Sequence, residues 1–162
     1  YKRFGSIFMK TIKSIYSKKT IMKMTKIDDN VYIGSSPSSS DQLSFISSTI
    51  CLQEEEEKLS NYPAFKFILN IPTPDYTSPS QEQITEALNF IEAHKNGNVL
   101  IHCKAGIGRS AIISVAYISR KYRMSLPEAH KYVSERRNIS KLYIANVMNP
   151  QWKVLNNYLN NN

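Results

Sequence analysis

The sequence predicts a single α/β domain in which helices flank a central, mostly parallel and twisted sheet, with an amphipathic helix at the N-terminus. Short apolar runs typical of buried strands alternate with segments whose apolar residues recur at helical spacing. The 162 residues, 41% of them hydrophobic, suffice for one domain with a substantial core. No apolar run approaches the ~20 residues that a membrane-spanning helix needs. We therefore expect a basic arm at residues 1–27, a folded body at residues 28–159 and a polar tail at residues 160–162.

The arm has the pattern of an amphipathic helix, with lysines on one face and, on the other, apolar side chains at three- and four-residue spacing: Phe4, Phe8, Ile12 and Ile15. The net charge of +8 belongs to this arm, because residues 1–27 carry eight basic side chains and no acidic one. Such a segment is typical of a mitochondrial presequence, of a membrane-surface anchor, or of a helix that docks in an apolar groove. The groove could belong to its own subunit or, by exchange, to a second copy. We favour a docked arm.

In the first half of the body, apolar runs predict three strands, at residues 31–34, 49–53 and 65–71. A helix is expected around residues 41–48, after a stretch rich in serine and proline. Cys51 lies in the second of these strands, where a plain core position is its ordinary role.

The second half of the body is expected to contain four helices. The first begins with a capping box at residues 78–81, has proline at its first helical position and ends at Gly97. The second begins at Ser110. A further capping box begins a helix over residues 125–136, and the Asn-Pro pair at residues 149–150 begins the last.

A strand, a tight loop and a helix follow one another between residues 98 and 124, and the rest of the chain is organised around them. The strand occupies residues 99–102, the loop residues 103–109, and the helix begins at Ser110. This arrangement directs successive backbone N–H groups and a helix N-terminus at one point, which binds an anion. Gly106 and Gly108 allow the loop a positive φ and bring its amides close to a ligand.

Cys103 and Arg109 would meet at that anion site. Their spacing lets the guanidinium of Arg109 fold back and hold two phosphate oxygens. The helix dipole, the amides and the guanidinium all favour a thiolate, so we expect the pKa of Cys103 to fall well below the ~8.5 of a free cysteine. A thiolate beneath a bound phosphate is an in-line nucleophile at phosphorus. A lone cysteine is more often a core residue, but the loop, helix and arginine around this one favour the nucleophile.

Cleavage of a phosphate ester also needs an acid to protonate the leaving oxygen, and Asp75 is the candidate. It follows a predicted buried strand, in a loop stiffened by prolines, and so belongs to the same sheet edge as Cys103. A plain turn is the alternative for this segment. No cluster of Cys and His has the spacing of metal ligands, and we expect neither a metal nor a cofactor. Two cysteines indicate a reducing compartment, the cytoplasm, rather than a disulfide framework.

The stretch His102-Cys103, five residues on to Arg109-Ser110, resembles the signature of the cysteine-dependent protein tyrosine phosphatase superfamily. The resemblance implies that Cys103 is the nucleophile, that Asp75 is first the acid and then the base, and that Ser110 donates a hydrogen bond to the departing thiolate. It also implies a phosphate cradle formed by a set of loop residues, with the histidine helping to hold the loop: His102, Lys104, Ala105, Gly106, Ile107, Gly108 and Arg109. A rhodanese-type sulfur carrier and an arsenate reductase are the alternatives, which the two glycines and the helix at Ser110 make less suitable.

Most of the chain, residues 25–159, resembles the compact dual-specificity branch of that superfamily. The resemblance implies hydrolysis of phosphotyrosine and of phosphoserine or phosphothreonine in proteins through a cysteinyl-phosphate. We find no counterpart of the loop that deepens the pocket of tyrosine-only members. Residues 20–34 and 149–158 are similar to poxvirus virion members of this branch, which implies a homodimer formed through the N-terminal helix and a place in the virion or host cytoplasm.

Two other functions stay open at this point. Lys104 makes the loop similar to those of phosphoinositide and phosphatidylglycerophosphate phosphatases, and with the basic arm it suggests a phospholipid substrate and contact with a membrane surface. A catalytically idle phosphate-binding module is disfavoured because Cys103, Arg109 and Asp75 are all present. We expect a phosphorylated protein as the substrate and no nucleic-acid partner.

Overall fold

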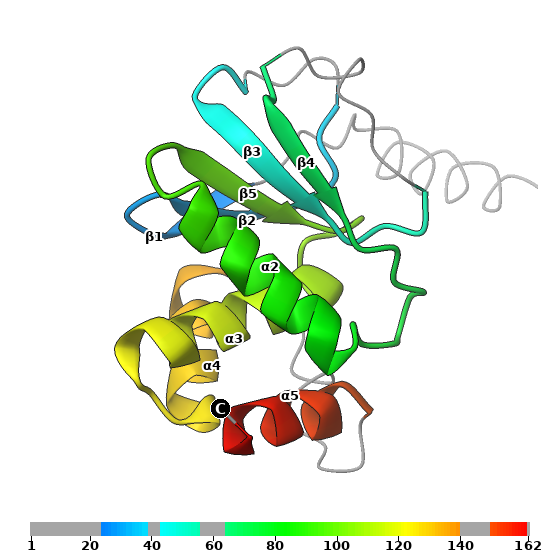
Figure 1. Ribbon diagram of the computed structural model, residues 1–162, viewed down its shortest axis with the longest axis vertical. Helices are drawn as coiled ribbons and strands as arrows, with labels where there is room; N and C mark the ends of the chain where they lie inside the picture. Colours follow the sequence, from blue (N-terminus) through cyan, green and yellow to red (C-terminus); the bar gives the residue numbers. More distant parts are fainter. Residues whose placement is uncertain (1–23, 39–42, 56–63, 140–149, 162) are drawn as a thin grey trace, which may run out of the picture.

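A computed structural model describes residues 24–38, 43–55, 64–139 and 150–161 of the chain. Figure 1 shows a twisted sheet on one side of the molecule and helices packed beneath it. The expected α/β domain with a mostly parallel sheet is thereby confirmed.

Among the described residues, five strands form the sheet, in the order β1-β2-β5-β3-β4. Only the β1–β2 pair is antiparallel, and the other three pairs are parallel. β5 lies in the middle and is almost wholly buried, which suits its run of branched apolar residues. The strands are β1 (Met24–Asp28), β2 (Val31–Gly34), β3 (Ile46–Cys51), β4 (Phe67–Asn70) and β5 (Asn98–His102).

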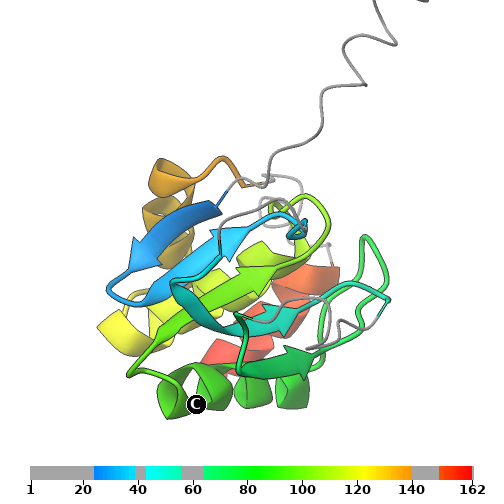
Figure 2. The same cartoon turned by 90° about the horizontal axis from the view of Figure 1, so that it is seen from above.

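The described helices all lie on one face of the sheet, as both views show (Figures 1 and 2). They are α2 (Gln81–Ala93), α3 (Arg109–Tyr122), α4 (Leu126–Arg136) and α5 (Pro150–Asn160). α3 is the central one and contacts β2, β5 and each of the other three helices. Its residues Ile112, Ile113 and Val115 are fully buried in the main core, which is the reason that this helix is apolar on most sides.

The opposite face of the sheet carries a smaller apolar cluster of Leu43, Ile46, Phe65 and Leu100. The helix expected around residues 41–48 is wrong from Leu43 onwards, because a turn closed by Ile46 N donating to Leu43 O leads directly into β3. β3 pairs with β5 from Ile46 on, so tertiary pairing decides the structure of this segment. Helices on both faces were expected, whereas loop residues pack on this face of the described sheet.

The two predicted capping boxes differ in outcome. The one at Ser125 is confirmed, because Ser125 N donates to Glu128 and Leu126 begins α4. The other lies two residues later than predicted: Ser80 accepts from Gln83 N, and the Gln83 side chain accepts from Ser80 N. Ser78 with Gln81 and Ser80 with Gln83 both have the spacing of a capping box. The Ser80 pair is the one that forms, because Ser80 has the extended backbone of an N-cap residue.

β1 begins at Met24, so the last residues assigned to the arm at residues 1–27 belong to the sheet. Met24, Thr25 and Lys26 pair with β2, which draws them into the folded body. The expected amphipathic helix otherwise falls on residues 1–23, outside the described residues, and its docking, exchange or membrane contact stays a prediction. In the part of the chain that the structure describes, no helix has the length and apolar character to cross a bilayer.

Candidate active site

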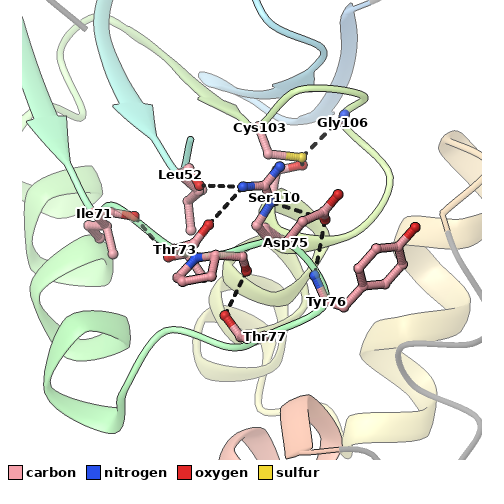
Figure 3. Close-up of polar contacts among 11 residues, drawn as sticks. Leu52, Ile71, Thr73, Asp75, Tyr76, Thr77, Cys103, Gly106 and Ser110 are labelled. Atoms are coloured by element: carbon pink, nitrogen blue, oxygen red, sulfur yellow. Dashed lines mark hydrogen bonds and ion pairs between the residues drawn. The ribbon is translucent and has the colours of Figure 1, made fainter. Parts of the chain in front are cut away.

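The loop between β5 and α3 folds around the sulfur of Cys103, which is only 3% exposed. Gly106 N donates a hydrogen bond to Cys103 Sγ across 3.3 Å, and Ser110 Oγ lies 3.4 Å from the same sulfur (Figure 3). Gly108 is the N-cap residue of α3, so the N-terminus of that helix begins at the loop. The sulfur thus lies on the floor of a cradle of donors.

The electrostatics of this cradle favour the thiolate. Burial raises the pKa of the Cys103 thiol, because an ion is poorly solvated inside the protein. Hydrogen bonds from the Ser110 hydroxyl and from the amides of Ser110, Gly106 and Gly108 together lower the pKa by more than burial raises it. The resulting pKa of Cys103 lies below its ordinary value, in the direction that the sequence predicted.

Gly106 has a φ of +69°, and a side chain there would place its Cβ 2.2 Å from Gly34 O. The loop therefore lies directly against the end of β2, closer than any residue with a side chain allows. This contact is the physical reason that a glycine stands at this position.

Arg109 begins α3 and its side chain is buried beside the cradle. Its Nη1 donates to Thr73 O across 2.7 Å and to Leu52 O across 3.3 Å, so the carbonyls of two strand-end loops hold the guanidinium. Its Nε has no hydrogen-bond partner among the described residues. A buried donor of this kind fits an oxygen of a bound phosphate.

Asp75 stands in the loop that follows β4, on the same side of the sheet as the cradle (Figure 3). Its Oδ1 lies 3.6 Å from Arg109 Nε and accepts a hydrogen bond from Tyr76 N across 3.1 Å. The carboxylate side chain is 54% exposed, which leaves it open to a leaving group and to water. Thr77 closes the turn by donating its hydroxyl and its amide to Pro74 O.

The remaining loop residues predicted for the cradle divide into two groups. Lys104, Ala105 and Ile107 are exposed on the loop. His102 is fully buried at the end of β5, and its carbonyl accepts a hydrogen bond from Leu52 N across 2.9 Å. Lys104 also lines a cleft of ≈730 Å³ beside the loop.

The structure adds three groups that sequence reasoning missed. The carbonyls of Leu52 and Thr73 orient Arg109, and the side chain of Arg137 contacts the outside of the loop. A backbone carbonyl leaves no trace in residue type, and Arg137 follows a helix with nothing in its spacing that points back to the loop. The described residues include no group of three or more His, Cys, Asp or Glu side chains arranged to hold a metal ion.

Together these groups could hold a tetrahedral anion directly over the Cys103 sulfur. Amides and a helix N-terminus surround the sulfur, a guanidinium edge stands at one side, and a carboxylate stands within reach of that edge. Donors fixed in advance by the fold stabilise charge that develops during a reaction without having to reorganise. The arrangement suits displacement at phosphorus.

Known proteins resemble this chain in sequence. Residues 31–158 match a family model described as the catalytic domain of dual specificity phosphatases. Human dual specificity protein phosphatase 1 is 42% identical over 73 residues, which cover 43% of this chain and 20% of that protein. Human dual specificity protein phosphatase 16 is 50% identical over 56 residues, 33% of this chain and 8% of that protein. The matched segments thus span a fifth or less of these curated relatives.

Solved structures share the fold. Tk-PTP in its active form is 28% identical with a TM-score of 0.72, over 83% of this chain and 95% of that one. PTPMT1 in complex with PI(5)P is 20% identical with a TM-score of 0.73, over 85% of this chain and 95% of that one, a likeness of fold alone. The similarity to poxvirus enzymes and the homodimer expected with it stay predictions.

Proposed function

The chain belongs to the dual specificity phosphatase family, and from this premise we propose that it hydrolyses phosphotyrosine and phosphoserine or phosphothreonine in proteins through a cysteinyl-phosphate. The observation that carries the proposal is the Cys103 sulfur, which accepts a bond from Gly106 N and lies beside Ser110 Oγ. These neighbours favour the thiolate form of the sulfur, at the one point where the loop would bind a phosphate.

In the first step the thiolate of Cys103 attacks phosphorus and a P–S bond forms. The P–O bond to the substrate hydroxyl breaks, and Asp75 donates a proton to the departing oxygen. The Nε edge of Arg109, which makes no hydrogen bond to the described residues and lies 3.6 Å from Asp75 Oδ1, binds the phosphoryl oxygens together with the loop amides, as their negative charge rearranges in the transition state.

In the second step a water molecule attacks phosphorus, and Asp75 accepts its proton. The P–S bond breaks, inorganic phosphate leaves, and Ser110 Oγ donates a hydrogen bond to the sulfur as it regains its charge. The 3.4 Å separation of Ser110 Oγ and Cys103 Sγ supports this role. Substrate phosphate, one water and the chain's own residues complete the cycle.

A second candidate substrate is a phosphoinositide. The observation in its favour is Lys104, whose exposed side chain lines the cleft of ≈730 Å³ next to the cradle, together with the exposed apolar Ile107. A cation and an apolar side chain beside a phosphate site suit a lipid headgroup that carries further phosphates.

The test is kcat/KM on matched phosphotyrosine and phosphothreonine peptides and on a phosphoinositide. We expect both peptides to be hydrolysed with comparable kcat/KM and the lipid much more slowly. Cys103→Ser should abolish all turnover, whereas Cys51→Ser, at the other described cysteine, should keep it, because Cys51 lies in β3 outside the cradle. A strong preference for the lipid would replace the protein substrate by the second candidate, and turnover by Cys103→Ser would refute the mechanism.

A further inference from the structure

The peptide unit between Ala105 and Gly106 is bonded on both sides. Its N–H, that of Gly106, donates to Cys103 Sγ across 3.3 Å. Its carbonyl, Ala105 O, accepts from Arg137 Nη2 across 3.3 Å on the other side. Because a trans peptide is planar, its N–H and C=O point in opposite directions, so a donor that holds the carbonyl outward also holds the amide toward the sulfur.

The carbonyls of the two neighbouring peptide units also accept hydrogen bonds from outside the loop. Gly106 O accepts from Arg137 Nε across 2.6 Å, which is the shortest of these contacts. Lys104 O accepts from Ser36 N across 3.0 Å, at the end of β2. Three successive carbonyls of the loop are therefore each bonded on the outside, and a single side chain, Arg137, holds two of them.

Arg137 is itself fixed from two elements. It is the C-cap residue of α4, with its N–H donating to Val133 O, and its Nη1 donates to Thr25 Oγ1 of β1 across 3.2 Å. Its side chain therefore bridges α4 and β1 across the outer side of the loop. Its partners among the loop atoms are carbonyls, in contrast to Arg109, whose Nε makes no hydrogen bond within the described part of the chain and lies 3.6 Å from Asp75 Oδ1.

We propose that Arg137 is a positioning residue, which acts from outside the loop to keep the amides of Gly106 and Ile107 directed at the Cys103 sulfur and at bound phosphate. The effect has two parts. The planar guanidinium fixes the orientation of two consecutive peptide units, and its charge polarises them so that their N–H groups become stronger donors. The proposal deepens the proposed function, on which its consequence for catalysis rests.

A purely structural role is the competing explanation, in which Arg137 only ties β1, α4 and the loop together. The two explanations differ in what happens to the thiol. If Arg137 only stabilises the fold, its loss lowers the melting temperature and leaves the titration of Cys103 unchanged. If it positions the loop amides, its loss weakens the bonds to the thiolate and raises the pKa of Cys103.

The experiment measures the rate of Cys103 alkylation by iodoacetamide against pH, with and without inorganic phosphate, and needs no turnover. Three variants are compared with the wild-type chain. Arg137→Met removes the fork and the charge, and Arg137→Lys keeps the charge without the fork. Arg136→Met is the matched control, since Arg136 lies 3.5 Å over the Tyr132 ring and donates to Tyr132 O on its own helix.

We expect Arg137→Met to raise the midpoint of alkylation by about one pH unit and to weaken protection by inorganic phosphate about tenfold. Arg137→Lys should fall between this variant and the wild type, and Arg136→Met should match the wild type. Thermal unfolding of each variant separates these effects from stability.

A wild-type midpoint and wild-type phosphate protection in Arg137→Met would overturn the proposal, whatever its melting temperature. If Arg137→Met does not fold, Arg137→Lys decides in the same way, because a lysine cannot bond both carbonyls as a planar fork. A wild-type chain with a low thiol midpoint and phosphate protection, but with no hydrolysis of any phosphoester, would refute the proposed function alone.

Discussion

At the scale of single residues, Cys103 shows how hydrogen bonds can favour the charged form of a buried thiol. Burial by itself would keep this thiol neutral, and only hydrogen bonds directed at the sulfur reverse that tendency. Two of the donors, Gly106 N and Ser110, come from the loop and from the first turn of α3. The reactivity of the thiol therefore depends on the loop conformation more than on any one neighbouring charge.

Asp75→Asn tests the assignment of the acid. The variant keeps the size of the side chain but cannot donate a proton to the leaving oxygen. The loss in kcat/KM should therefore be larger for a substrate whose leaving oxygen needs that proton. We expect kcat/KM to fall about 10²- to 10³-fold for a phosphothreonine peptide. For an activated aryl phosphate, whose leaving oxygen needs little protonation, the fall should be less than about tenfold. Equal losses on both substrates would remove Asp75 as the acid.

Residue identity alone was enough to predict which groups the structure brings together at the candidate site. Cys103, Arg109 and Ser110 are close in sequence and their spacing has a chemical meaning, and Asp75 could be placed at the same edge because it follows a strand. Arg137 could not be found in this way. Its contact with Gly106 joins residues 31 positions apart, and only the packing of α4 against α3 and β1 brings them together.

At the scale of elements, a polar cluster holds the β1–β2 hairpin against α3. Asp28, at the end of β1, is buried and accepts hydrogen bonds from Tyr117 Oη across 2.6 Å and from Tyr122 Oη across 2.7 Å. Lys121 Nζ lies 2.5 Å from the same carboxylate. Burial raises the pKa of Asp28, but the bonds from Lys121 and the two tyrosines outweigh it and lower the pKa to about 2.

Asp28→Asn should therefore lower the free energy of unfolding by about 2 kcal/mol at neutral pH, since the wild-type pKa is depressed from 3.8 to about 2. The sign follows from the lowered pKa: the contribution of the carboxylate is complete above its unfolded value. It is lost as the pH falls from roughly 4 toward 2, where the wild type and the variant should converge.

Urea unfolding at several pH values checks this expectation, with Asp29→Asn as the matched control because Asp29 is the exposed neighbour in the hairpin turn. The midpoint should move with the slope unchanged. An Asp28→Asn chain as stable as the wild type at pH 7 would show that the cluster contributes nothing net to folding.

The elements differ in how well a local pattern determines them. β5, α3 and α4 follow their apolar spacing and caps, and the structure agrees with the sequence to within a residue or two. The segment from Leu43 to Ser48 carries a mixed pattern, and pairing of β3 with β5 makes it a turn and a strand. The start of α2 depends on which of two equivalent capping boxes closes, a choice that no residue type decides.

At the scale of the whole molecule, the site exists because separate chain segments end at one edge of the sheet. Leu52 follows β3, Thr73 and Asp75 follow β4, and Cys103 follows β5. Arg109, at the start of α3, donates hydrogen bonds to Leu52 O and Thr73 O and so joins the segments after β3 and β4 to this helix. The parallel order of β4, β3 and β5 brings these ends together, as a switch of strand order commonly does in α/β proteins. The alternation of strands and helices in the sequence is enough to predict that these ends lie at one edge of the sheet. The order of the strands is visible only in the structure.

The central claim is that Cys103 carries the phosphoryl group between the two steps, and trapping that intermediate tests it most directly. Asp75→Asn, mixed with an activated aryl phosphate, should form the P–S bond readily but hydrolyse it slowly, because the variant lacks the base for water. Rapid quenching and peptide mass analysis should then find one phosphoryl group on the peptide that contains Cys103. The double variant that combines Asp75→Asn with Cys103→Ser should carry none on that peptide. Continued turnover with no phosphoryl group on Cys103, or with the group on another residue, would contradict the account.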